Sequence, residues 1–299
     1  MSKDMMTQAI NKVTIVGKLL DATFAKGNTK DGKPYERANI TIRVTQKNGN
    51  RTETSDIPAS AFATQFTSKG APNPAYESLQ RLKDLKTAQN VGIDNADYIR
   101  LAGNAVGNLR ENAFVSKSGQ LVTGWQINFS FFNTGKAEET ATFWNELFIM
   151  DMKEEVDREG DTTGRLIIKG GIVQYGGNLD VMEFVVEEPS CVNFLTNNLE
   201  VNQTMILGGR IRYTTVEEVS ASSGSWGEEV AASNTKTVRE LVISGGDEGP
   251  KDEDFSYDPV EVKKAFNVRK AKMDQMMLNA KNKGTIPPVE KKPSLGSWE

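Results

Sequence analysis

The sequence predicts an all-β fold with a minor α-helical part: two five-stranded β-barrels in tandem, followed by a mostly disordered tail that contains one helix. Three observations predict it. Apolar segments that alternate with polar residues and end at turn residues fill most of residues 11–246. The order of three strands, a helical segment and two strands occurs twice, at 11–134 and at 135–246. From residue 247 the chain becomes acidic and rich in Gly and Pro, which is typical of a linker.

The first unit follows residues 1–10, which we expect to be flexible. Its first strand, at 11–26, contains Gly17, which indicates a bulge or a sharp bend. The second strand, at 36–47, alternates apolar residues with basic and polar ones, so one face is buried and the other is basic. The remaining elements are a third strand at 51–59, helical segments at 60–66 and 74–86, and strands at 96–115 and 120–133. Trp125, Phe129 and Phe131 share the phase of Ile127 in the last strand and are expected in the core.

The second unit repeats the order of the first. The long segment between its last two strands, at 216–234, is rich in Ser, Gly and Glu and is predicted to be a mobile loop. The expected elements are strands at 141–152, 165–175 and 179–188, a short helix at 189–200, and strands at 203–215 and 236–245.

The tail, at 247–299, divides into three parts. Residues 247–258 form an acidic linker. Asp258, Pro259 and Glu261 then provide an N-cap, a first-turn proline and an N3 carboxylate, which predict a helix over about 259–282. The last residues are too rich in proline to be regular.

The composition excludes most catalytic chemistry. The chain has no histidine and one cysteine, Cys191, so Ser-His and Cys-His nucleophile systems, His-ligated metals and disulfides within the chain are excluded. We expect a binding protein with no catalytic residue, cofactor or metal, and a carboxylate-metal enzyme is the least favoured alternative. The low cysteine usage, with no signal-like or membrane-spanning segment, predicts the reducing cytoplasm, or the host cytoplasm for a viral protein.

Charge is distributed unevenly along the chain. The net charge is −4 overall, yet residues 1–134 carry 17 basic against 11 acidic residues, a net charge of +6. Residues 135–246 carry a net charge of −10, and the tail is neutral. This distribution favours a polyanion as the ligand of the first unit, and ordinary scatter among solvated faces is the alternative.

Strands that bend at glycines in this order are typical of small closed barrels of the OB type, which bind oligonucleotides on the face of strands two and three. Four further features are more specific: Asn11–Leu19, the turn Asp31-Gly32-Lys33-Pro34, the alternating strand Ala38–Val44, and Thr52-Glu53 at the start of the third strand. Together they resemble the opening of single-stranded DNA-binding proteins of the bacterial and phage type. The resemblance implies OB barrels and single-stranded DNA binding.

The chain also differs from the bacterial members of that family. It has a second barrel-like unit, an expanded helical region at 67–96, and no Asp-rich tail that ends in Pro-Phe. The double barrel resembles a phage-like member.

The candidate binding residues are cations that could follow a phosphate backbone and aromatic rings that could stack on bases. A solvated face is the alternative for the cations, and packing is the alternative for each ring. The predicted nucleic-acid-binding residues are Lys18, Phe24, Lys26, Lys33, Tyr35, Arg37, Arg43, Lys47, Arg51, Tyr98 and Arg100.

The preferred function is a sequence-independent single-stranded DNA-binding protein that acts in DNA replication, recombination or transcription. The alternative is a structural or scaffolding protein, such as a virion or replisome adaptor, built from the same barrels. RNA as the ligand and self-association stay open. By analogy of role with bacterial relatives, we expect the tail to recruit replication or transcription proteins through Phe266, Met273, Met277 and Trp298.

Overall fold

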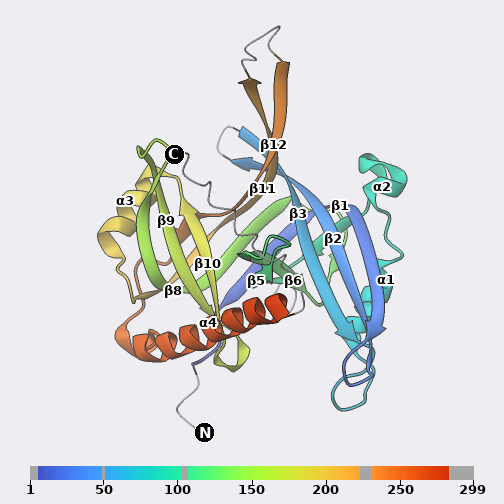
Figure 1. The fold of residues 1–299 in the computed structure, drawn as a ribbon. Helices are drawn as coiled ribbons and strands as arrows, with labels where there is room; N and C mark the ends of the chain where they lie inside the picture. Colours follow the sequence, from blue (N-terminus) through green and yellow to red (C-terminus); the bar gives the residue numbers. More distant parts are fainter. Residues whose placement is uncertain (1–5, 49–50, 103–106, 223–229, 283–299) are drawn as a thin grey trace, which may run out of the picture.

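The computed structural model describes residues 6–48, 51–102, 107–222 and 230–282 of the chain. It confirms the predicted fold class, which is mostly β with few helices and a C-terminal helix. Two barrels lie side by side, and a long β-hairpin projects from one of them (Figure 1). The described strands form one continuous 12-stranded sheet, in the order β11-β12-β10-β9-β8-β1-β2-β3-β6-β5, with β4 and β7 off this path.

The second barrel is closed by hydrogen bonding from its first strand to its fourth. β8 pairs with β9, β9 with β10, β10 with β12 in parallel, β12 with β11, and β11 again with β8. This is the strand order of an OB barrel, with a helix between the third and fourth strands. Phe143 and Phe184 pack at its centre, with ring centroids 5.6 Å apart. Its elements are β8 (Thr140–Val156), β9 (Thr162–Val173), β10 (Leu179–Val186), α3 (Pro189–Asn198), β11 (Thr204–Ser222) and β12 (Val230–Gly246).

The first barrel has the same order. β1 pairs with β2, β2 with β3, β3 with β6 in parallel, and β6 with β5, while β4 pairs with β1. Gly17 lies where β1 crosses β2, and a Cβ there would overlap the carbonyl oxygen of Arg43, so the predicted bend requires glycine. The elements are β1 (Asn11–Asn28), β2 (Pro34–Asn48), β3 (Arg51–Thr64), α1 (Pro74–Leu82), α2 (Ala88–Val91), β4 (Tyr98–Leu101), β5 (Gly107–Val115), β6 (Leu121–Phe129) and β7 (Asn133–Thr134). The helical segment predicted at 60–66 is wrong, because residues 60–64 pair with β2 and continue β3.

Both barrels bury the residues that alternation predicts. Trp125, Ile127 and Phe129 on β6 are buried, and the guanidinium of Arg239 lies 4.2 Å from the centroid of the Trp125 ring. Phe131, which was also expected in the core, is only half-buried, and the adjacent Phe132 is buried instead. The alternation ends there because β6 ends at Phe129.

The hairpin formed by β11 and β12 is longer than predicted. Backbone pairing continues to Ser222 opposite Val230, so most of the segment expected to be a loop is in strand. Its Ser-rich composition suggested a loop because side chains there give no apolar alternation, whereas the hydrogen bonds of the ladder involve only the backbone.

The acidic segment 247–258 is not a free linker. The amides of Asp247 and Lys251 donate to the carbonyls of Ile206 and Thr204, and the ammonium of Lys251 lies 2.7 Å from a carboxylate oxygen of Glu146. These contacts fasten a segment whose composition alone predicts disorder. η3 (Glu253–Phe255) is its only regular element in the described chain.

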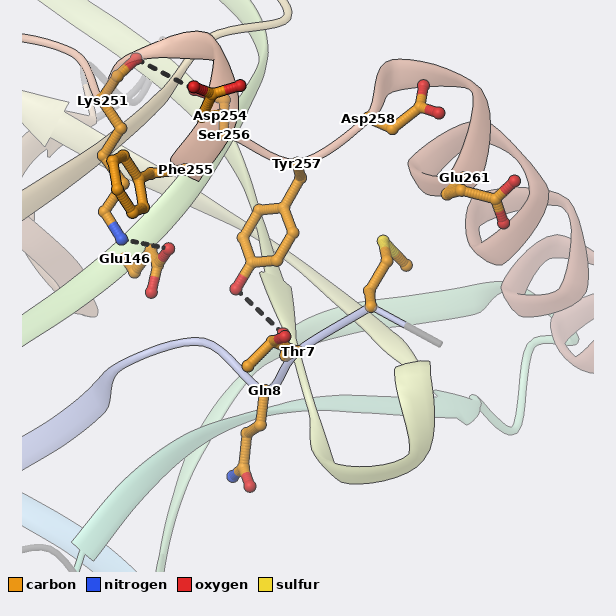
Figure 2. A pocket seen from close by; sticks show the side chains of 11 residues that line it. Thr7, Gln8, Glu146, Lys251, Asp254, Phe255, Ser256, Tyr257, Asp258 and Glu261 are labelled. Atoms are coloured by element: carbon orange, nitrogen blue, oxygen red, sulfur yellow. Dashed lines mark hydrogen bonds and ion pairs between the residues drawn. The ribbon is translucent and has the colours of Figure 1, made fainter. Parts of the chain in front are cut away.

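Residues 6–10 lie against the same region and are likewise held. The hydroxyl of Tyr257 donates to the carbonyl of Thr7 at 3.1 Å (Figure 2). The amide of Ala9 donates to the carbonyl of Val173. Burial and the neighbouring carboxylate of Glu146 raise the pKa of Tyr257, so its hydroxyl keeps its proton.

The predicted helix is present as α4 (Pro259–Asn282), with the amide of Val260 donating to the Asp258 carboxylate at 2.8 Å. It runs across the second barrel toward β5 (Figure 1). Arg269 pairs with Glu111 on β5, and Lys272 donates to Asn178 at 2.9 Å, so α4 contacts both barrels. No helix in the described part of the chain is long and apolar enough to cross a membrane.

Candidate nucleic-acid interface

A groove of about 710 Å³ runs over the outer face of the first barrel. It crosses β2, β3, β6 and β5, where alternate side chains point away from the core. We call it the outer groove. Its lining residues are Arg37, Asn39, Ser60, Ala61, Phe62, Asn108, Arg110, Asn112, Gln126, Asn128, Phe129 and Ser130.

An aromatic pair and a cation lie at one end of the outer groove. Phe62 is 50% exposed, and its ring packs on Tyr35 with centroids 5.0 Å apart. Arg37 is the cross-strand neighbour of Phe62 and is exposed, with no carboxylate partner among the described residues. An exposed ring beside an unpaired guanidinium can stack on a base and hold its phosphate.

A second arginine in the outer groove is partly neutralised. The Nε of Arg110 lies 2.8 Å from an oxygen of Asp180 on the second barrel. Arg110 therefore joins the two barrels, and Arg37 carries the positive charge that is available to a ligand.

The exposed predicted cations do not gather at one point. Lys26 and Lys33 lie at the β1–β2 turn end of the sheet, and Lys47 lies toward the other end of β2. At about 3.3 Å per residue, Lys47 is about 33 Å along the strand from Arg37. Arg100 is exposed on β4, a strand that does not line the outer groove. These positions allow a track along β2 rather than a compact site.

Other predicted residues are engaged inside the protein. Arg43 donates from Nε and Nη2 to Asp56 at 2.8 and 2.7 Å, and these hydrogen bonds raise the pKa of Arg43. The ammonium of Lys18 donates to the carbonyl of Ile93 at 2.7 Å. To contact a phosphate, either residue would first have to give up these bonds.

Two predicted stacking rings are also engaged. Tyr98 donates to Glu139 at 3.0 Å, and burial together with this bond raises the pKa of its hydroxyl. Phe24 packs against the core, with the ammonium of Lys83 5.5 Å from its ring centroid. The Arg51 side chain lies outside the described residues.

The residues proposed for partner binding on α4 face the body of the protein. Met273 is 9% exposed, Phe266 and Met277 are half-buried, and the guanidinium of Arg269 lies 5.6 Å from the Phe266 ring. Trp298 lies outside the described residues. Recruitment of a partner by this stripe stays a prediction, and it would require α4 to leave the barrels.

Sequence reasoning missed most of the outer groove. It identified Arg37, and Tyr35 behind Phe62, but it assigned the strand at 120–133 only by its inward residues. The signal was present, because the outward positions of β5 and β6 carry amides and arginine where a solvated strand would more often carry Lys, Glu or Thr. The missed residues are Asn39, Ser60, Phe62, Asn108, Arg110, Asn112, Gln126, Asn128 and Ser130.

The cleft between residues 6–8 and 251–261 has the opposite character (Figure 2). It has a volume of about 500 Å³ and is lined by the carboxylates of Glu146, Asp254, Asp258 and Glu261, with Lys251 as the one cation among its lining residues. Such a surface repels phosphate. No group of three or more His, Cys, Asp or Glu side chains in the described chain could hold a metal ion.

Comparison with known proteins gives one family match. The family model described as YorF matches residues 9–278. No curated protein matches the chain.

Among solved structures, a deletion mutant of the single-stranded DNA-binding protein from Thermus aquaticus matches with a TM-score of 0.48 and 12% identity. The alignment covers 85% of this chain and 99% of that one. The wild-type Thermus aquaticus protein matches with a TM-score of 0.45 and 10% identity, over 82% of this chain and 97% of that one.

Proposed function

The chain belongs to the YorF family, and we propose that it binds single-stranded DNA through the outer groove of its first barrel. The observation that carries the proposal is the exposed Phe62 ring, backed by Tyr35 and flanked by the unpaired Arg37, on the β2–β3 face of an OB-ordered barrel. This is the face on which OB barrels bind oligonucleotides.

Two physical terms favour this ligand. Phosphates attract mobile cations, and the first unit carries a net charge of +6. Bases stack on exposed rings with little regard to their identity, because every base has a π-face. Phosphate contacts and stacking together give binding that accepts any single-stranded sequence, with no chemistry performed on it.

The biological role follows as part of the same proposal. A protein that coats single strands acts wherever DNA is unwound, in replication, recombination or transcription. The same groove also fits single-stranded RNA, so the polymer preference is a result to be measured. Recruitment of other proteins through the tail is a separate proposal.

The test is a titration of the full chain with a fluorescent oligomer of about 16 nucleotides. We expect Phe62→Ala to weaken binding about tenfold, because stacking contributes about 1–3 kcal/mol per base. We expect Arg37→Ala to lower the slope of log K against log salt by about 0.7, as one phosphate contact is lost. Matched controls are Phe255→Ala and Arg158→Ala, which remove an exposed ring and an exposed arginine far along the chain.

Two results would count against the proposal. Binding that is insensitive to salt would exclude phosphate contacts. No binding at low salt would leave the structural or scaffolding function as the better account.

A further inference from the structure

The outer groove is lined by more carboxamides than charges. Five of its side chains are Asn or Gln, and two are Arg. Four polar residues fall in one line across four strands: Asn39 on β2 pairs with Ser60 on β3, Ser60 with Asn128 on β6, and Asn128 with Asn108 on β5. We call this line the carboxamide row.

The row has unused hydrogen-bonding capacity. Ser60 donates to the Oδ1 of Asn39 at 2.9 Å, which fixes one end. At the other end, the Oδ1 of Asn108 is buried and has no hydrogen-bond partner within the part of the chain that the structure describes. The side chain of Asn128 has no partner among the described residues. Buried polar atoms are nearly always paired, so the Asn108 oxygen points to a partner outside the protein, and the Asn128 carboxamide, which also lines the outer groove, is available to the same ligand.

The chemistry of a carboxamide selects the kind of partner. It offers a donor and an acceptor in one plane. A phosphate only accepts, so it would leave the carboxamide oxygens unpaired. The edge of an unpaired base offers a donor beside an acceptor, and in a duplex the pairing edge is already occupied.

We infer that the carboxamide row hydrogen-bonds the edges of unpaired bases and gives the outer groove a preference among them, an inference that rests on the single-stranded DNA binding proposed above. Phosphate and stacking contacts bind any sequence. The row adds a contribution to the binding free energy that depends on the base, because a mismatched edge leaves polar groups of the row, among them the buried oxygen of Asn108, unpaired.

The experiment compares the full chain with the double variant Asn108→Ala, Asn128→Ala. Oligo(dA), oligo(dC) and oligo(dT) of about 16 nucleotides are titrated at one salt concentration. Oligo(dA) stacks on itself, so the readout is the ratio of the affinities for the three oligomers and the change in that ratio on substitution. The control is Asn193→Ala, which removes an exposed carboxamide from α3.

In the unmodified chain we expect the best and worst oligomers to differ by about tenfold or more. In the double alanine variant the ratio of the highest to the lowest affinity should fall to about threefold or less, because the base-edge contacts are gone. Asn193→Ala should leave the ratio unchanged. The double serine variant, Asn108→Ser, Asn128→Ser, repeats the test with small hydroxyl side chains if the alanine pair proves unfolded by circular dichroism.

The outcomes separate the two proposals. Salt-dependent binding with equal affinities for the three oligomers overturns the base-edge inference and leaves single-stranded DNA binding intact. The same holds if the double alanine and double serine variants keep the affinity ratio of the unmodified chain. No binding to any oligomer overturns both.

Discussion

The carboxylate of Glu36 is buried on β2 between Arg37, which lines the outer groove, and Tyr35, which packs on the groove residue Phe62. Its oxygens lie 2.5 Å from the ammonium of Lys83 and 2.6 Å from the amide of Gln80. Because side chains alternate along a strand, holding Glu36 inward holds its neighbours outward. Burial opposes the charge, but the hydrogen bonds from Lys83 and Gln80 outweigh it and lower the pKa of Glu36 below its ordinary 4.5.

Replacing Lys83 with Met should lower the free energy of unfolding by about 2–3 kcal/mol at pH 7, because it leaves a buried carboxylate without its cation. A group with a depressed pKa stabilises the fold above its unfolded pKa, and this contribution is lost as the pH falls through the folded pKa. The difference in the free energy of unfolding between the variant and the unmodified chain should therefore become smaller below about pH 4.5. Urea titrations at several pH values measure it, with the exposed Lys86→Met as control. If this difference in the free energy of unfolding is constant with pH, the buried charge of Glu36 is not its cause.

Single residues were the hardest level to predict. Arg37 and Arg43 both lie on β2, yet Asp56 is the cross-strand partner that neutralises Arg43, and Phe62 is the partner that leaves Arg37 free. A sequence does not reveal which residue lies opposite which before the register is known. The amides of β5 and β6 were missed for the same reason, because they gain meaning only when the register aligns them with Asn39 and Ser60.

At the scale of elements, a side chain joins two strands of the first barrel. Asn11 on β1 donates to the carbonyl of Leu109 on β5 at 2.7 Å and accepts from the Leu109 amide at 2.9 Å. It also accepts from the side chain of Asn145 on β8 at 2.8 Å. The side-chain amide of Asn11 thus pairs with the backbone of Leu109 as a neighbouring strand would, at the point where β1, β5 and β8 meet.

Asn11→Ala should destabilise the protein by about 2–3 kcal/mol, since it leaves buried backbone groups unpaired. Hydrogen exchange should show faster exchange at the Leu109 amide, while amides within the β2–β3 ladder keep their protection. Lys12→Ala, at the exposed neighbouring position, is the control. Unchanged protection at Leu109 would mean that other contacts close the barrel.

Strongly patterned elements were predictable, and those defined by pairing were not. β2 follows from its alternation, and α4 begins at Pro259 because Asp258 caps it. The outer half of the β11–β12 hairpin has no such pattern, and its strands are recognised only from their pairing with each other. The acidic segment at 247–258 was expected to be disordered because nothing in its composition indicates the carbonyls of Thr204 and Ile206 that receive its amides.

At the scale of the whole molecule, the two barrels share one sheet. Residues 11–16 of β1 pair with β8, so the first strand of one barrel is also an edge partner of the other. A charged cluster adds a second connection: Arg212 pairs with Glu53 on β3 and with Glu187 and Glu240 on the second barrel. α4 supplies a third through the pair of Arg269 with Glu111.

These connections predict that the chain unfolds as one cooperative unit, although the sequence divides it near residue 134. Scanning calorimetry should give one transition, with calorimetric and van't Hoff enthalpies in a ratio of about 1. A fragment of residues 1–134 should fail to fold stably, because it leaves the β8-facing edge of β1 unpaired and loses the partner of Asn11. Removal of residues 247–299 should lower the transition temperature without dividing the transition, because β1 and β8 remain paired. Two separate transitions in the full chain would show instead that the barrels are independent domains that merely touch.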